Sequence, residues 1–417
     1  MNLQSKWLRV VAMLCLLAAI STAAWARTQI TFMTPLGGED GGFMDEIIAE
    51  FNAAHPDIEV VHLVVVSSVE YTMRLSTGIA AATAPQVLFI RKFDMPPFMP
   101  HFKTFTPEEL LGHGIDVADI FPALLDGLVV ENRVHGIPLD AWIFYLAYNR
   151  DNFARAGLNP DDPPANLDEW MNAMEALKAV TPEGLTPYYE NVQWAWLFVH
   201  LLWQFGGDLL TPDFREPAFE EAGAKALHLL LEMQDRGFVP KDLPISPGPP
   251  FLAGDTSALI TGVWTVRAFA EVLGENFGVA PAPQLGTHES VFGGTHVLAM
   301  PEVMVRDPVV LNAAMTWVRY LWDNALDWYA AGQTPARISI TESAEFRERL
   351  PHIYTIAQQL PYVRTFPFFP HISSVVDEIA PYVERALIAR DITPEEAMRL
   401  AAEHVAVFLE DYWLGVE

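Results

Sequence analysis

The sequence has almost no cysteine: Cys15 is the single one among 417 residues. It lies in an apolar run near the N-terminus and is followed by Leu16 and Leu17, so it does not stand at a lipid-attachment boundary. Downstream of that run the chain can form no disulfide, thiolate metal site or cysteine nucleophile. The fold must therefore be held by its apolar core, for which 51% hydrophobic residues supply the material.

Basic residues are also scarce, because 25 Lys and Arg stand against 53 Asp and Glu, which gives a formal net charge of −28. A chain this acidic is repelled by nucleic acids and by anionic lipid surfaces. We therefore expect no nucleic-acid partner and a soluble, monomeric protein. A neutral ligand is compatible with this charge, since the bulk charge does not describe the ligand site.

Long hydrophobic runs are missing, with one short exception. Residues 10–20 are continuously apolar, Lys6 and Arg9 precede them, and the small-residue sequence A-W-A follows at 24–26. The run is too short for a membrane helix of about 20 residues, and its order is that of a secretory signal peptide. We predict a signal peptide over residues 1–26 and a secreted, periplasmic protein; a retained membrane anchor is the alternative.

Motifs of several enzyme and cofactor classes are absent. The sequence contains no H-E-x-x-H, no G-x-S-x-G and no Walker-type loop, and its histidines show no metal-ligand spacing. We expect no metal, no cofactor and no covalent chemistry. A carboxylate pair for glycoside hydrolysis stays open, because among 53 acidic residues some pair is always available.

The chain after residue 26 opens with alternating strands and helices. The expected strands are Gln29–Thr34, Ile58–Val66 and Gln86–Ile90, with one amphipathic helix in each interval. This order predicts a parallel sheet with helices on both faces, and ligands bind outside the carboxyl ends of such strands. The loops at that edge are Gly37–Gly42, Ser67–Val69 and Arg91–Asp94.

Strand character returns late in the chain. An aromatic strand is expected at Trp142–Tyr148, a helix-rich block follows, and strands reappear at Phe277–Ala280 and Val291–Met300 before a largely helical end. The late strands need a sheet to join, and the simplest solution sends them back to the first lobe. The pattern predicts an α/β molecule of two discontinuous lobes.

Short motifs in a fixed order carry a resemblance to a known family. They are F-M-D-E-I-I-A-E-F-N-A-A-H-P-D at 43–57, A-P-Q-V at 84–87, H-G-I-P at 135–138 with Y-N-R-D at 148–151, F-G-G at 292–294 and G-Q-T-P-A-R at 332–337. Together they resemble the family 1 extracellular solute-binding proteins, the sugar-binding subunits of ABC importers. Gln86 departs from the pattern, which has Asp at that place.

The resemblance implies a type II periplasmic binding protein fold. It implies a first lobe of 27–140 plus 278–323, a second lobe of 141–277 plus 324–417, and crossings near Leu139–Trp142, Gly278 and Trp322–Asn324. The resemblance implies that the two lobes close about a hinge around a small solute, a sugar in this family, and deliver it to the transmembrane subunits of an ABC permease. Three alternatives stay open: a solute such as glycerol phosphate or a related phosphorylated polyol, a secreted carbohydrate-active enzyme, and signalling to a membrane sensor.

A sugar site needs aromatic planes and polar groups held in fixed directions. The residues predicted to contact the solute are Glu39, Asp94, Trp142, Tyr145, Trp194, Trp264, Gly293, Gly294, Thr295 and Arg337. Trp264 ends the sequence T-G-V-W, which resembles the family's G-x-W at a second-lobe helix.

Each of these residues also has an ordinary structural interpretation. Glu39, like its neighbour Asp40, and Asp94 suit exposed loops, and the aromatic residues, Trp196 included, suit the core. The glycine pair and Thr295 suit a tight strand entry, while Arg337 suits a brace at the hinge. Arg91 and Lys92, at the end of the third strand, could meet an anionic group or pair with nearby acids.

Overall fold

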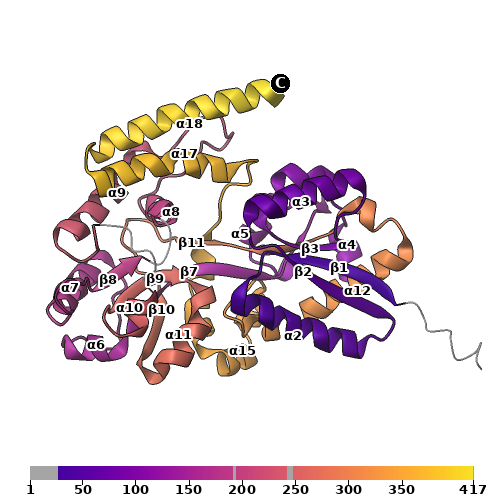
Figure 1. Ribbon diagram of the computed structural model, residues 1–417, viewed down its shortest axis with the longest axis horizontal. Helices are drawn as coiled ribbons and strands as arrows, with labels where there is room; N and C mark the ends of the chain where they lie inside the picture. Colours follow the sequence, from indigo (N-terminus) through magenta and orange to yellow (C-terminus); the bar gives the residue numbers. More distant parts are fainter. Residues whose placement is uncertain (1–26, 191–193, 242–247, 417) are drawn as a thin grey trace, which may run out of the picture.

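The computed structural model describes residues 27–190, 194–241 and 248–416, so the predicted signal peptide lies outside the described residues. The chain forms two lobes, each built on its own β-sheet and covered by helices (Figure 1). The predicted two-lobe α/β architecture is confirmed.

The first sheet has the strand order β2-β1-β3-β12-β6. Its strands are β1 (Thr28–Thr34), β2 (Ile58–Val64), β3 (Val87–Arg91), β6 (Ile137–Pro138) and β12 (His296–Ala299). Strands β1, β2 and β3 are parallel, whereas β12 runs antiparallel to β3 and β6. Successive side chains of β1 point to opposite faces of the sheet, so the strand contacts helices on both faces. Phe32 packs edge-on against Trp317 of one helix, and the Met33 carbonyl accepts a hydrogen bond from Tyr71 of another.

The second sheet is centred on one long strand, β7 (Asp140–Asn149), all of whose residues are buried. Its other strands are β8 (Tyr188–Glu190), β9 (Ala258–Gly262), β10 (Phe277–Pro281), β11 (Val291–Gly294), β13 (Thr334–Pro335) and β14 (Val363–Arg364). Strands β9, β10, β11 and β13 all pair antiparallel with β7. A small hairpin, β4 (Val129–Val130) and β5 (Arg133–Val134), forms a separate two-stranded sheet.

Helices cover both sheets. In the first lobe they are α2 (Gly38–Ala54), α3 (Ser68–Ala81), α4 (Pro107–Gly112), α5 (Pro122–Leu125) and α12 (Pro308–Asp323). In the second lobe and at the hinge they are α6 (Arg150–Arg155), α7 (Leu167–Lys178), α8 (Trp194–Gln204), α9 (Glu220–Asp235), α10 (Gly248–Leu252), α11 (Val266–Leu273), α13 (Ala325–Tyr329), α14 (Ile338–Thr341), α15 (Ala344–Arg349), α16 (Pro351–Ala357), α17 (Ile372–Glu384) and α18 (Pro394–Val416). Among the helices of these described segments, none is long and apolar enough to cross a membrane.

The return of the chain to the first lobe differs from the prediction. We expected the crossing near Gly278, but β10 pairs with β7 along its whole length and β11 also pairs with β7. The first strand to rejoin the first sheet is β12, so the crossing falls at Thr295. The sheet that these strands join could not be predicted, because short apolar strands have the same sequence pattern in either sheet. The other boundaries of the two lobes stay predictions.

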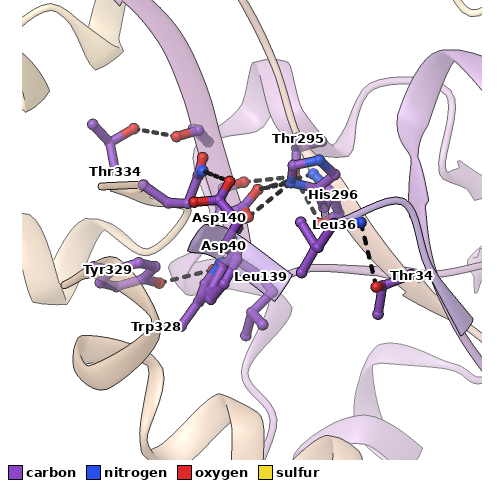
Figure 2. A network of polar contacts seen from close by, with 12 residues as sticks. Thr34, Leu36, Asp40, Leu139, Asp140, Thr295, His296, Trp328, Tyr329 and Thr334 are labelled. Carbon is purple, nitrogen blue, oxygen red and sulfur yellow. Dashed lines mark hydrogen bonds and ion pairs between the residues drawn. The ribbon is translucent and has the colours of Figure 1, made fainter. Parts of the chain in front are cut away.

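One buried carboxylate ties the chain segments that pass between the lobes. Asp140, at the first crossing, has no exposed surface. It accepts hydrogen bonds from the His296 backbone N–H at 2.9 Å, from His296 Nδ1 at 2.9 Å and from Trp328 Nε1 at 2.8 Å (Figure 2). His296 follows the second crossing and Trp328 belongs to the third. The three crossings therefore meet at a single side chain.

Further hydrogen bonds to backbone carbonyls reinforce this hinge. Thr295 Oγ1 donates to the Asp140 carbonyl at 2.6 Å, Tyr329 donates to the Leu139 carbonyl at 2.8 Å, and Thr334 donates to the Ala141 carbonyl at 2.5 Å (Figure 2). Each bond joins a residue of the second or third crossing to the first. The start of β7 is thus the common anchor of the hinge.

We predict that Asp140→Asn lowers the free energy of unfolding by about 2 kcal/mol. The amide NH2 group cannot accept a hydrogen bond, so at least one buried donor that bonds the carboxylate loses its acceptor. Thermal or urea unfolding measures the loss. Asp45→Asn is the matched control, since Asp45 is 63% exposed and bonds only at the surface to His62, where such pairs contribute under about 1 kcal/mol. Equal losses in the two variants would contradict a special role of Asp140.

Candidate functional site

Two tryptophans lie close together where the lobes meet, each in space left by a glycine. The Trp142 indole lies against Gly294, where an added Cβ would fall 2.0 Å from the ring. Trp264, in the 3-10 turn after β9, lies against Gly262 with the same 2.0 Å separation. The ring centroids are 6.3 Å apart and edge-on. Gly294, predicted to contact the solute, therefore makes room for an aromatic ring.

Further aromatic rings from both lobes extend this pair. Trp196 of α8 stacks on Trp142 at 5.9 Å, and Phe93, which follows β3 of the first lobe, meets Trp142 at 6.4 Å. Phe93 also contacts Phe366 of the second lobe at 5.6 Å. We call these five residues the aromatic wall. Phe93, Trp196 and Trp264 keep partly exposed surface, so the wall offers apolar faces of the kind on which sugar rings stack.

Polar groups of both lobes border the aromatic wall. Asp40, in the first turn of α2, accepts a hydrogen bond from Gln333 Nε2 at 3.4 Å. Gln333 is 1% exposed, and its Oε1 has no hydrogen-bond partner; the buried Nε1 of Trp142 has none either. Gly332, the neighbour of Gln333, lies against the Trp264 backbone. A buried acceptor, Gln333 Oε1, and a buried donor, Trp142 Nε1, therefore lack hydrogen-bond partners in this region.

The ionisation of Asp40 is strongly affected by this setting. Burial is the main cause that raises its pKa to about 6, and the charges of Asp140 and Glu39 act in the same direction, while His296 and the Gln333 hydrogen bond oppose them. Figure 2 shows Asp40 beside Asp140 and His296. Asp40, in the loop edge that the sequence predicts for binding, thus lies next to Asp140, the hinge anchor.

Asp94 and Arg91 form a pair at the end of β3. Arg91 Nε bonds Asp94 Oδ2 at 2.9 Å, and the Ser68 hydroxyl lies 3.4 Å from the same carboxylate. Burial raises the pKa of Asp94, and Arg91 opposes that shift. Arg91 therefore takes the alternative of pairing with a nearby acid. Glu39, in contrast, is exposed on α2 and free to reach a solute.

Four other predicted residues are occupied by protein contacts. Tyr145 has no exposed surface and bonds Thr265 at 2.9 Å, and Thr295 bonds the Asp140 carbonyl. Gly293 pairs with Ile143 in the sheet. Arg337 bonds Asp119 at 3.0 Å and covers the Trp322 ring at 4.5 Å, which is the bracing alternative. Tyr145 and Gly293 thus serve the core and the sheet of the second lobe, while Thr295 and Arg337 bond within the protein near the crossings.

Trp194 begins α8, but its side chain lies outside the described residues, so its predicted contact stays a prediction. The sequence analysis did not single out Phe93 and Phe366, which belong to the aromatic wall, or Gln333, which bonds Asp40. Gln333 lies inside the G-Q-T-P-A-R motif, which could have drawn attention to it. Nothing in the local sequence distinguishes Phe93 or Phe366 from core residues, because only the packing of two lobes brings them together.

A cavity of about 1090 Å³ also lies between the lobes. It is lined by Ala123 and Asp126 from the first lobe and by Asp208, Arg364 and Thr365 from the second, with apolar residues between. Of the nine predicted contact residues whose side chains the structure describes, none lines it. The cavity and the aromatic wall are therefore separate parts of one interlobe boundary.

Comparison with known proteins fits this geometry. The model of the family "Bacterial extracellular solute-binding protein" matches residues 35–321. The sn-glycerol-3-phosphate-binding periplasmic protein UgpB of Pectobacterium atrosepticum is 23% identical over 440 residues, which cover 95% of this chain and 94% of that protein.

Solved structures share the fold. The sugar-binding protein MalE of Xanthomonas citri superposes with a TM-score of 0.79 at 21% identity, covering 93% of this chain and 99% of that one. UgpB of Mycobacterium tuberculosis in complex with glycerophosphocholine gives a TM-score of 0.76 at 19% identity, covering 93% and 99%. The fold is that of the MalE-like type II periplasmic binding proteins.

We predict a pH-dependent difference between wild type and Asp40→Asn. The raised pKa means that the folded state must hold a buried charge above about pH 6, whereas an unfolded Asp ionises near its ordinary value of 3.8. As the pH falls from 7.5 to 4.5, wild type gains stability that the variant cannot gain. The melting temperature of wild type minus that of the variant should therefore increase as the pH falls across this range. A difference that stays constant would contradict the raised pKa of Asp40.

Proposed function

Because the chain belongs to the bacterial extracellular solute-binding protein family, we propose that it captures a carbohydrate or related polyol between its lobes in the periplasm and passes it to an ABC permease. The related proteins are named as periplasmic binding proteins, and structural neighbours are named as binding sugars. We propose that the solute lies against the aromatic wall.

The observation that supports this placement is that two buried polar atoms, Trp142 Nε1 and Gln333 Oε1, have no hydrogen-bond partner. A buried donor or acceptor without a partner costs about 1–3 kcal/mol. A hydroxylated solute could accept from Trp142 Nε1 and donate to Gln333 Oε1, and its ring could stack on Trp264. Glu39, Asp40 and Asp94 supply carboxylate acceptors for further hydroxyls.

Closure follows from the origin of these groups. Asp40, Phe93 and Asp94 belong to the first lobe, while Trp264 and Phe366 belong to the second. A solute that touches both sets binds the closed arrangement more strongly than the open one, so it shifts the population toward closure. The solute is then enclosed, as delivery to a permease requires.

A phosphorylated polyol is the second candidate solute. The names of the relatives favour it, because UgpB proteins are described as binding sn-glycerol-3-phosphate and one was solved with glycerophosphocholine. Arg267 of α11, which also pairs with Glu271 at 3.1 Å, lies 5.0 Å over the Phe43 ring of α2 and places a cation across the boundary of the lobes. We propose binding without turnover for either solute.

We predict that one class of solute raises the melting temperature of the protein in a dose-dependent way. We also expect that solute to be chemically unchanged after incubation with the protein. A panel of sugars, polyols, glycerol phosphate and glycerophosphodiesters separates the two candidates. A ligand at 100 times its Kd adds about 2.7 kcal/mol of stability, which is a shift of roughly a few degrees in a large protein. Chromatography of the solute checks turnover, and product formation would instead support a carbohydrate-active enzyme.

Trp264→Ala is expected to weaken solute binding by about tenfold or more while the fold is retained, because stacking on one aromatic ring contributes about 0.5–1.5 kcal/mol beyond the burial of its area. Trp264→Phe, which keeps an aromatic plane, should lose much less. Calorimetric titration measures both Kd values. If Trp264→Ala binds like wild type, Trp264 is not part of the site.

A further inference from the structure

One lysine is buried between the lobes. Lys92, directly after β3, is 3% exposed. Its ammonium donates to the Ala123 carbonyl of α5 at 2.9 Å and to the Thr365 hydroxyl at 3.2 Å. Ala123 belongs to the first lobe, as Lys92 does, whereas Thr365 directly follows β14 of the second sheet. A single charged group therefore bonds both lobes.

The surroundings of Lys92 are unusual for a buried cation. Both of its bonded acceptors are neutral oxygens, and Asp126, exposed on the adjoining loop, acts on it only through its charge. Burial lowers the pKa of Lys92 to about 8, with Asp126 opposing, so the ammonium keeps its charge at neutral pH. A buried cation without a bonded carboxylate is costly to maintain, which argues for a role that an apolar residue could not fill.

The residue next to Lys92 touches the second lobe as well. Phe93 meets Phe366 at 5.6 Å and Trp142 at 6.4 Å. Two consecutive residues of the first lobe thus contact two consecutive residues of the second. The polar contact lies beside the cavity that Ala123 and Thr365 line, and the aromatic contact lies in the aromatic wall. The same two segments carry both contacts.

We propose that the Lys92–Thr365 hydrogen bond is a latch that favours the closed arrangement of the lobes, so that Lys92 sets solute affinity without contacting the solute. On this proposal, separation of the lobes would break the bond to Thr365, which belongs to the second lobe, and would spare the bond to Ala123, which belongs to the first. The bond therefore stabilises only the closed state, and the affinity of a solute that needs closure rises with the closed population. The affinity effect rests on the proposed function; the lobe equilibrium does not.

Thr365→Val tests the latch, since it removes the hydroxyl and keeps the shape. Thr365→Ser is the matched control, because it keeps the hydroxyl. Spin labels at Leu111→Cys and Val407→Cys, on α4 of the first lobe and α18 of the second and each 59% exposed, report the interlobe distance in a Cys15→Ser background. Lys92→Met is a second variant, and Thr365→Val carries the test if Lys92→Met does not fold.

Without solute, Thr365→Val should move part of the distance distribution away from the closed distance, and Thr365→Ser should not. The Kd for the solute found in the panel should rise about tenfold, the size expected for a hydrogen bond to a charged group, chiefly through faster dissociation. Distances and Kd that match Thr365→Ser would overturn the latch. A lower melting temperature with unchanged distances would also overturn it and assign Lys92 a structural role.

The solute-free measurement separates this proposal from the proposed function. If no solute binds but the distances shift in Thr365→Val, the latch stands and the proposed function fails. If the solute contacted Thr365 directly, the Kd would change while the solute-free distances stayed as in wild type, and the latch would be wrong.

Discussion

The structure depends on one constraint, the convergence of three interlobe crossings on the Asp140 carboxylate. A fully buried carboxylate is stable only when its oxygens accept hydrogen bonds. Here the donors are His296 and Trp328, which come from later parts of the chain. The requirement fixes where His296 and Trp328 must lie. It thereby fixes the relation between the two sheets at their junction, and lobe motion must take place around this point.

The same strand carries the hinge and the aromatic wall. Asp140 and Trp142 stand two residues apart on β7, so their side chains share one face of the strand. Asp40 is close to Asp140 and His296 as well as to Gln333. A solute that displaces water from this region changes the electrostatic surroundings of the hinge anchor. Site and hinge are thus coupled by proximity, without a long pathway between them.

Sequence patterns predicted the elements well and their partners less well. Strand and helix periodicity located β1 to β3 and the helices between them, since local residues set these elements. The assignment of β10 and β11 to a sheet was wrong, because pairing partners distant in sequence leave no local trace. The same reason applies to the candidate site: the solute contact that the G-x-W motif predicts for Trp264 stays a prediction, whereas Gly293 and Tyr145 serve the sheet and the core. Phe93 and Phe366 could not be recognised before the lobes were placed.

Charge placement separates the roles of the two interlobe regions. At the aromatic wall the Arg91–Asp94 pair lies beside Phe93, and the buried atoms without a hydrogen-bond partner are Trp142 Nε1 and Gln333 Oε1, which suit the hydroxyls of a neutral solute. Beside the cavity, Arg364 bonds Asp208 at 2.6 Å within the second lobe, whereas the Lys92 ammonium bonds an oxygen of each lobe. The wall is therefore the better place for capture, and the cavity side is the better place for control of closure.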